Sequence, residues 1–334
     1  MKKIVVMPVK NEDWILEKSL AAACLWADHV IVADQNSTDG TKEICKKFPK
    51  VVVVPNASES FNEGQRRQFL LNAAREFSGN NVIFALDADE IISGDSITEQ
   101  TLEQLISQMK PGSSAELPWI QLWKSPVAYR HDASVWSNSY KHFVYFDDRQ
   151  MSFTTTGIHL PRVPESSLAH SSRNEGIKVL HYQFVVWSRM LAKQRFYRVL
   201  EKIVDPHKSS FRINARYRVT TNERNMRLLP VPDQWLAPYR GQGIDLEHFT
   251  EVNLYPYEVE VLRAFGKFGT APFRWLDIWD IDWDQKKQIA LQEGFLDIPS
   301  HIGNPQFWYM SAVNRFLDSL IDYGRTSTAG EKKD

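Results

Sequence analysis

The chain has 334 residues, of which 43% are hydrophobic and 24% are charged, the ordinary range of globular proteins. This length is enough for one large domain or two ordinary ones. The formal net charge of −1 excludes a bulk electrostatic attraction to nucleic acid, so we expect no nucleic-acid partner.

The start of the chain lacks the features of a signal peptide, because Lys2 and Lys3 precede only a short apolar run that Pro8 interrupts. No stretch reaches the roughly eighteen apolar residues that a membrane span needs. Cys24 and Cys45 have no CxxC neighbour, and we expect both to be reduced. These features predict a cytoplasmic protein, with peripheral contact at the inner face of a membrane as the alternative that they leave open.

The first hundred residues alternate between strand and helix patterns. Short, continuously apolar runs predict strands at 2–9, 29–34, 51–55 and 82–86, and helical spacing predicts helices at 11–27, 41–48, 65–76 and 97–109. Apolar strands separated by helices are typical of a mostly parallel sheet with helices on both faces. We therefore expect an α/β fold whose strand-end loops meet at one edge of the sheet.

The pattern changes after residue 115, where aromatic residues and alternation predict an antiparallel extension of the sheet over 116–159. Residues 164–176 are expected to form a surface loop. Helices are predicted at 187–204, 256–265 and 305–323. These patterns suggest a catalytic domain at 1–185, a mainly helical, aromatic-rich region at 186–325 and a disordered tail at 326–334.

Two carboxylates follow the fourth predicted strand. Asp87 and Asp89 are one residue apart, so on an extended chain both side chains point to the same side. Two carboxylates at the carboxyl end of a strand suit Mg²⁺ or Mn²⁺, which keep open positions for substrate phosphates. The alternative is a charged exit from the strand with no ligand.

Four motifs in order resemble family 2 glycosyltransferases with the GT-A fold. They are the segments PVKNE from Pro8, ADQNSTDGT from Ala33, FNEGQRRQ from Phe61 and LDADE from Leu86. The resemblance covers about residues 3–95 well and 96–185 weakly. It implies the GT-A fold, with a Rossmann-like sheet, and a nucleotide-sugar donor, with UDP-sugars favoured.

The resemblance also assigns roles to individual residues. It implies that Asp87 and Asp89 form the DxD motif that binds the metal and the donor, with His181 as a further metal ligand. A core histidine is the alternative for His181. The remaining residues implied to bind the donor are Pro8, Asn11, Glu12, Asp34 and Arg67, with Arg66 as an alternative to Arg67.

The catalytic base is the weakest part of the resemblance. Relatives place an acidic residue after the DxD motif, in an ED-like or HE-like pattern. The nearest matches here are Asp148, which follows Asp147 in a segment typical of a hairpin turn, and His159, which lacks the acidic residue that follows it in the HE-like pattern. Both are held as rival candidates.

Together these features predict a metal-dependent, inverting glycosyltransferase that acts on a glycan or a lipid-linked acceptor, in surface polysaccharide or lipopolysaccharide synthesis. Inversion is implied by the resemblance alone. One alternative is a sugar-phosphate nucleotidyltransferase, although the segment after the first strand has no glycine to build a phosphate loop. Another is a non-catalytic carbohydrate-binding protein on the same fold.

Overall fold

The structure is a computed structural model that describes residues 1–56, 62–155, 160–221, 223, 225–307, 309–310, 312–314 and 316. The chain forms two compact units, and the first contains residues 1–186 and 225–250. The second contains residues 187–224 and the chain from 251 onward. Residues 225–250, which follow the predicted boundary at 185/186, belong to the first unit.

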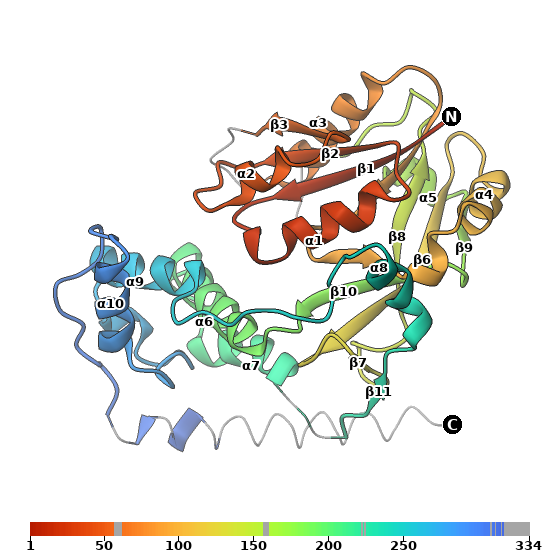
Figure 1. Cartoon of the computed structure of the whole chain (residues 1–334). Coiled ribbons are helices and arrows are strands. Elements are labelled where there is room, and N and C mark those ends of the chain that lie inside the picture. The colour runs from red at the N-terminus through yellow and green to blue at the C-terminus, as the bar shows by residue number, and fades with distance from the viewer. Residues whose placement is uncertain are drawn as a thin grey trace. The chain divides into compact units, whose positions relative to one another are not determined.

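The first unit is built on a mixed sheet (Figure 1). Its strands within the described residues are β1 (Lys2–Val9), β2 (His29–Asp34), β3 (Val51–Pro55), β4 (Asn81–Ala85), β5 (Glu90–Ile92), β6 (Ser114–Trp123), β7 (Ala128–Arg130), β8 (Ser139–Phe146), β9 (Ser171–Arg173), β10 (Val179–Phe184) and β11 (Leu228–Pro230). The main path runs β11-β7-β6-β8-β4-β1-β2-β3, while β9 and β10 pair with β6, and β5 pairs with β10.

Helices surround this sheet. Those of the first unit are α1 (Asp13–Cys24), α2 (Thr41–Cys45), α3 (Glu63–Arg75), α4 (Glu99–Gln108), α5 (Glu165–Leu168) and α8 (Ala237–Gly241), with short 3₁₀ turns η1 (Gly94–Ser96) and η2 (Asp233–Trp235). The four strands β3, β2, β1 and β4 are parallel, and β8 continues the sheet antiparallel to β4. The predicted α/β fold with a helix-covered parallel sheet and an antiparallel extension is confirmed.

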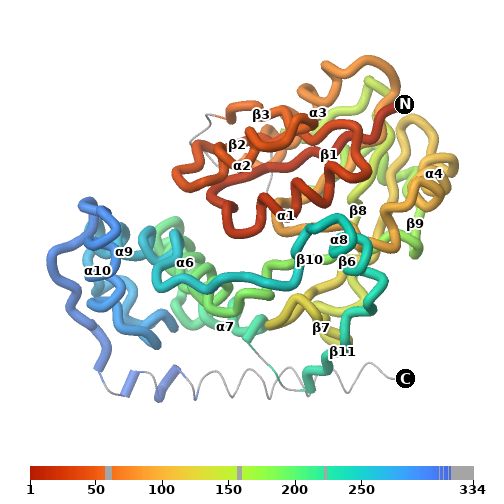
Figure 2. The backbone as a smooth tube through the Cα atoms, in the orientation of Figure 1, coloured from red at the N-terminus to blue at the C-terminus, as the bar shows by residue number. Residues whose placement is uncertain are grey.

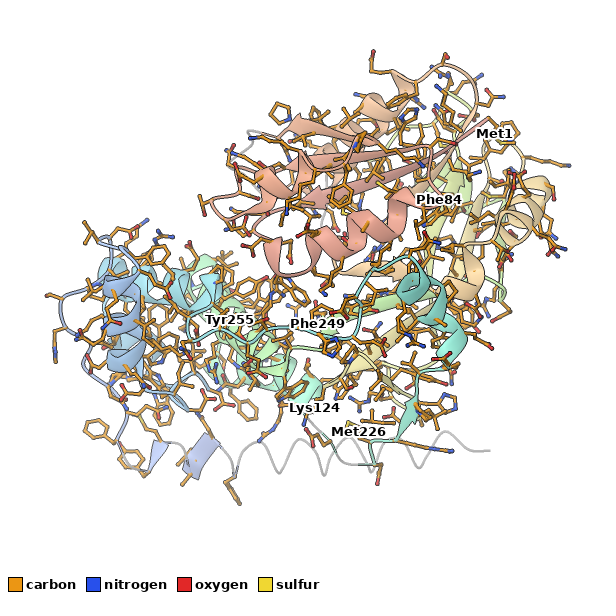
Figure 3. All side chains as sticks on the ribbon, in the orientation of Figure 1. Met1, Phe84, Lys124, Met226, Phe249 and Tyr255 are labelled. Carbon is orange, nitrogen blue, oxygen red and sulfur yellow. The ribbon has the colours of Figure 1, made fainter. Side chains whose placement is uncertain are left out.

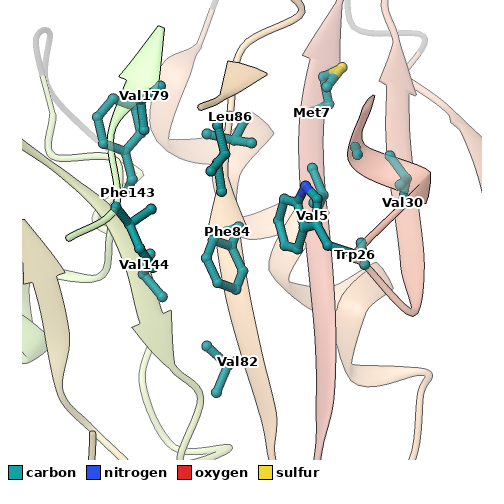
Figure 4. Packing of buried hydrophobic residues seen from close by; sticks show 14 of the residues in the cluster. Val5, Met7, Trp26, Val30, Val82, Phe84, Leu86, Phe143, Val144 and Val179 are labelled. Carbon is teal, nitrogen blue, oxygen red and sulfur yellow. The ribbon is translucent and has the colours of Figure 1, made fainter. Parts of the chain in front are cut away.

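Successive side chains of β1 point to opposite faces of the sheet, and each face carries its own hydrophobic core. Val5, Met7 and Val9 pack with residues of α1, α2 and α4, whereas Ile4 and Val6 pack with residues of α3. Figure 4 shows the first core, in which the rings of Trp26 and Phe84 meet edge to face at 4.7 Å between centroids. Burying one such ring contributes about 1.5–3 kcal/mol, so both faces of the sheet hold the strands in place.

The segment 225–250 joins the first unit through aromatic contacts. The Tyr239 hydroxyl donates to the carbonyl of Ile92 at 2.5 Å, and the Trp235 ring lies 5.4 Å from that of Tyr129. Phe249 contacts Trp14 and Tyr182, and its position is labelled in Figure 3. In Figure 2 this teal segment can be followed past β6 and β10.

The second unit is helical, as predicted. It contains α6 (Trp187–Val204), α7 (Ser210–Thr221), α9 (Pro256–Phe268), the 3₁₀ turn η3 (Ala271–Phe273) and α10 (Trp283–Gln292). Its core joins Val199 of α6 to Val261 and Leu262 of α9 and to Trp283 of α10. Within the described residues, no helix is both long and apolar enough to cross a bilayer.

Some local expectations were wrong. The described residues 151–155 form no strand, so Asp147 and Asp148 do not join two strands of a hairpin. The predicted loop at 164–176 contains the short elements α5 and β9. His159, the tail at 326–334 and most of the predicted helix at 305–323 lie outside the described residues.

Candidate nucleotide-sugar site

The carboxyl ends of β1, β2 and β4 meet at one edge of the sheet. Val9 at the end of β1 lies beside Asp34 at the end of β2, and Val6 pairs with Ala85 near the end of β4. Asp87 and Asp89 follow β4 directly. The parallel register therefore brings the predicted residues Asn11, Asp34 and Asp87 to the same edge, as expected for strand-end loops.

Hydrogen bonds tie the loop after β1 to the loop after β2. Asn11 has a left-handed backbone conformation, with φ of 54°, which asparagine tolerates better than most residues. Its N–H donates to the Ser37 hydroxyl at 2.9 Å, and its side-chain oxygen accepts from the Thr38 N–H at 2.8 Å. The Glu12 N–H donates to the Thr41 hydroxyl at 3.2 Å. The two loops thus form one continuous wall.

Asp34 is buried in this wall, with 4% of its surface exposed. One carboxylate oxygen accepts from the Ser37 N–H at 3.1 Å, and the Lys42 ammonium lies 3.7 Å from the other. A buried carboxylate is costly unless it has such polar partners. The arrangement holds Asp34 in one orientation at the strand end.

Glu90 organises the turn that carries Asp87 and Asp89. Its carboxylate is fully buried and accepts from the Trp119 indole at 2.9 Å and from the Asp87 N–H at 2.8 Å. Both of its oxygens also accept hydrogen bonds from Arg162. Burial raises the pKa of Glu90, and the Arg162 guanidinium acts in the opposite direction. Glu90 therefore fixes the backbone of the turn that carries Asp87 and Asp89 rather than facing a ligand.

Arg162 links Glu90 to the first aspartate of the motif. It donates to the Asp87 carboxylate at 2.9 Å. Although burial acts to lower the pKa of Arg162, the neighbouring Asp87 and Glu90 carboxylates raise it, so the guanidinium stays charged. Sequence reasoning missed both Glu90 and Arg162. The position of Glu90 inside LDADE was a usable signal, whereas Arg162 lies 72 residues further along the chain and had none.

Asp89 faces His181 instead. A carboxylate oxygen of Asp89 lies 3.6 Å from Nε2 of His181, and both residues are buried. The other ring nitrogen, Nδ1, lies 2.7 Å from the Gln121 side-chain oxygen, and the Trp119 ring stacks on the imidazole at 4.6 Å between centroids. An Nδ1–H that donates to Gln121 leaves the lone pair of Nε2 directed at the Asp89 side.

This pair has the chemistry of a partial metal site. A carboxylate and an imidazole held by a second hydrogen bond are a donor set that suits Mn²⁺. Among the described residues, no group of three His, Cys, Asp or Glu side chains could hold a metal ion together. Asp87 is engaged by Arg162, so Asp89 and His181 are the protein atoms that fit the ion, and its remaining positions would fall to other oxygen ligands.

A cavity of about 120 Å³ opens beside the turn. Pro8, Asp87 and the guanidinium groups of Arg66, Arg67 and Arg162 contribute to its lining. Arg67 donates to the carbonyls of Leu160 and Pro161 and pairs with Glu63 on α3. Burial is the main cause of the lowered pKa of Arg67. The structure thus brings Pro8, Arg67 and Asp87 to one cavity, which three arginines and two acidic residues line.

Asp148 lies at the opposite edge of the sheet. β8 is antiparallel to β4, with Phe146 opposite Val82, and the Asp147 N–H donates to the carbonyl of Asn81 at the start of β4. Asn81 precedes Asp87 by six residues, about 20 Å along a strand at ~3.3 Å per residue. This placement does not fit the prediction that Asp148 is the base.

Hydrogen bonds to nearby groups explain the structural roles of Asp147 and Asp148. Asp147 makes a bidentate pair with Arg75 at 2.7 and 2.9 Å. Asp148 accepts from the N–H groups of Gln150 and Met151, both at 2.8 Å, and these backbone hydrogen bonds lower its pKa. Both residues therefore stabilise the chain directly after β8, although this segment is not the hairpin turn that the sequence predicted.

Residues 4–157, a little under half of the chain, match the family model described as glycosyl transferase family 2, and the mostly parallel sheet of this part of the chain is consistent with the GT-A fold. No curated protein matches the chain.

Two solved structures are similar to part of the fold. Glucosyl-3-phosphoglycerate synthase from Mycobacterium tuberculosis, crystallised with Mn²⁺, UDP and glucosyl-3-phosphoglycerate, is 18% identical, with a TM-score of 0.26. The match covers 36% of this chain and 44% of that one, so the chain spans less than half of that relative. 4-Diphosphocytidyl-2C-methyl-D-erythritol synthase is 15% identical, with a TM-score of 0.27 and coverage of 44% and 74%. The family assignment rests on the family model.

Proposed function

We propose that this protein is a metal-dependent, inverting glycosyltransferase. It transfers a sugar from a nucleotide-diphosphate sugar, with UDP-sugars favoured, to a glycan or a lipid-linked acceptor in surface polysaccharide or lipopolysaccharide synthesis. The observation that carries the proposal is the Asp89/His181 pair at the strand-end edge of a family 2 domain. The cavity with Arg66, Arg67 and Arg162 lies beside the same turn.

Each part of the edge has a role in this proposal. The wall of Asn11, Glu12 and Asp34 binds the nucleoside, with the buried Asp34 carboxylate accepting from the base. Arg67 and Pro8 line the cavity next to the diphosphate, where a planar guanidinium suits phosphate oxygens. Asp87 orients the donor, and Arg162 holds the Asp87 carboxylate in place.

Asp89 and His181 would hold Mn²⁺ or Mg²⁺, which would supply positive charge beside the leaving diphosphate. The proton of the acceptor hydroxyl goes to a base. His159 stays the candidate for this role and lies outside the described residues.

A thermal-shift panel tests the donor site. UDP-, GDP-, dTDP- and CMP-sugars are added with and without Mn²⁺ to the wild type, to Asp89→Ala and to Asp297→Ala, whose aspartate is exposed in the second unit and pairs with Arg263. We expect one nucleotide class to raise Tm in a manganese-dependent way, because a ligand that binds only the folded state stabilises it by mass action. Asp89→Ala should abolish this shift and Asp297→Ala should retain it. No shift with any donor would overturn the proposal.

The reaction outcome separates the alternatives. NMR of the product should show an anomeric configuration opposite to that of the donor sugar. A retained configuration would contradict the inverting mechanism. Release of pyrophosphate from a nucleoside triphosphate and a sugar phosphate would instead identify a nucleotidyltransferase.

A further inference from the structure

A second cleft lies on the first unit, beyond the end of β7. Its volume is about 450 Å³, within the range of roughly 300–1,000 Å³ typical of ligand pockets. None of its lining residues lines the cavity beside Asp87, and five of the six carry polar side chains. They are His131, Asp132, Ala133, Asn138, Asn225 and Arg227.

Two segments that are distant in the chain build this cleft across the β7–β11 pair. β7 is antiparallel to β11, and the His131 N–H donates to the carbonyl of Arg227 at 2.9 Å, which extends the pairing into the cleft. In Figure 3 the labelled Met226 marks the segment between Asn225 and Arg227. The cleft therefore rests on a backbone frame that does not depend on the side chain of Arg227.

Asp132, the acidic residue of the lining, is already neutralised inside the protein. The buried Arg130 donates to one of its oxygens at 2.7 Å, and the Ser134 N–H donates to the other at 2.8 Å. Although burial acts to raise it, the hydrogen bonds from Ser134 and Arg130 lower the pKa of Asp132 to about 2. Asp132 is therefore ionised at neutral pH, and the charge of Arg130 balances it.

Arg227 then adds a positive charge that the lining does not balance. Its side chain is exposed, and it forms no ion pair with any residue that the structure describes. His131, the remaining titratable residue of the lining, adds no negative charge in either protonation state. The charges of Arg130, Asp132 and Arg227 thus leave the cleft with a net positive charge, which attracts an anion.

The chemistry of the surplus charge favours a carboxylate. The planar guanidinium of arginine can bind both oxygens of a carboxylate side by side. One surplus charge matches the single charge of a carboxylate. A phosphate monoester carries roughly 1.5–2 negative charges at pH 7 and would stay partly unbalanced.

The two asparagines favour hydroxyl groups around that carboxylate. Among the described residues, the side chains of Asn138 and Asn225 have no hydrogen-bond partner, and both line the cleft. Each amide can donate and accept, as a sugar hydroxyl does. A cleft of about 450 Å³ is also much larger than a carboxylate group, which leaves room for the ring that carries it.

We propose that this cleft binds a sugar acid, with Arg227 on the carboxylate and Asn138 and Asn225 on the hydroxyl groups of the ring. The site goes beyond the proposed function, because it shares no residue with the nucleotide-sugar site and does not require glycosyl transfer.

Titration calorimetry tests the cleft without turnover. The probes are the methyl glycosides of glucuronate and galacturonate, their neutral counterparts from glucose and galactose, and glucose 6-phosphate, all at equal ionic strength. Arg227→Gln removes the charge of an exposed side chain, and Asn225→Gly removes an amide at a position with φ of 61°, which glycine adopts freely. The control Arg212→Gln removes an exposed arginine from α7 of the second unit.

We expect at least one uronate to bind the wild type and Arg212→Gln equally, and the neutral glycosides to bind about tenfold more weakly. Arg227→Gln should weaken uronate binding about tenfold, which corresponds to about 1.4 kcal/mol. Asn225→Gly should also weaken it, and added salt should weaken binding to the wild type because the attraction is screened.

Three results would overturn the sugar-acid site. They are equal uronate affinities in Arg227→Gln and the wild type, no uronate binding to the wild type, and tighter binding of glucose 6-phosphate than of any uronate. A thermal shift with UDP and Mn²⁺ should be equal in all four proteins. If the wild type binds a uronate but shows no shift with any nucleotide sugar, the proposed function fails and the sugar-acid site stands.

Discussion

At the residue scale, hydrogen-bond partners within the protein decide which acidic side chains can face a ligand. Asp87, Asp89 and Glu90 are neighbours in sequence, yet Glu90 is committed to Arg162 and Trp119, and Asp87 shares Arg162. Only Asp89 faces His181. The Gln121 side chain, 1% exposed, then holds the imidazole from behind. The site therefore depends on positioning residues as well as on ligands.

Gln121→Ala tests this support. Loss of the hydrogen bond to Nδ1 should weaken Mn²⁺ binding about 10–100-fold, because metal-binding imidazoles rely on such a partner for their orientation and tautomer. Mn²⁺ electron paramagnetic resonance in the presence of UDP measures the affinity directly. Gln150→Ala, at an exposed glutamine, serves as the control. Equal Mn²⁺ affinity in Gln121→Ala and wild type would show that Gln121 has no such role.

The acid dependence of stability tests the Arg130–Asp132 pair. The pKa of Asp132 falls from 3.8 to about 2 on folding, so the carboxylate contributes stability above pH 4 that is lost as the pH falls toward 2. Asp132→Asn should lower the free energy of unfolding by about 2 kcal/mol at pH 6, and the difference should shrink between pH 4 and pH 2. Urea denaturation of both proteins over this pH range measures it. A difference that does not change with pH would contradict the assignment.

At the element scale, the cavity depends on how closely α3 approaches the chain near residue 154. A Cβ atom added to Gly64 in the first turn of α3 would lie 2.1 Å from the carbonyl oxygen of Thr154 and 2.8 Å from a Leu160 methyl group. Arg67, one turn later, binds the carbonyls of Leu160 and Pro161. Glycine at position 64 therefore allows the approach that places Arg67 on the cavity.

Gly64→Ala should move the start of α3 and destabilise the protein by about 1–3 kcal/mol, the usual cost of overpacking. It should also reduce the thermal shift produced by UDP-sugars. The matched control is Gly241→Ala at the end of α8, where an added Cβ meets no atom within 4 Å. Equal denaturation midpoints for the two variants would show that the chain near Thr154 adjusts at no cost.

At the scale of the whole molecule, the second unit supplies an exposed apolar surface. On α6, Tyr197, Leu200 and Val204 have 36%, 37% and 76% of their surface exposed and lie on one face of the helix. Lys208, Arg212 and Arg216 follow on the next segment and on α7, and Lys208 and Arg216 pair with Glu201 of α6. An exposed apolar stripe with cations on the neighbouring segment is typical of proteins that bind anionic membranes peripherally.

The full chain should therefore sediment with vesicles that contain phosphatidylglycerol and not with pure phosphatidylcholine vesicles. Leu200→Ser/Val204→Ser should reduce this binding about tenfold or more, because each buried side chain contributes about 1.5–3 kcal/mol. The control Leu291→Ser/Leu296→Ser replaces exposed leucines of the same unit. Equal binding of both variants would exclude this surface of α6.

Local patterns in the sequence predicted most of the first unit. The alternation of apolar strands and helices indicated the parallel sheet, and strand ends indicated the edge where Asn11, Asp34, Asp87 and Asp89 meet, because parallel strands share one carboxyl edge. The same reasoning placed α6 at 187–204. Hydrophobic periodicity is a local property, so it can be read along the chain without knowing which elements pair.

Only the tertiary structure decided the contacts between distant segments. Arg162 meets Glu90 across 72 residues, and His181 meets Gln121 across 60, because strand register and loop paths bring them together. The antiparallel register of β8 placed Asp148 at the edge opposite Asp89, and residues 225–250 returned to the first unit. The sequence by itself determined which side chains end each strand. Pairing between strands, which depends on the packing of the whole unit, decided which of those side chains meet.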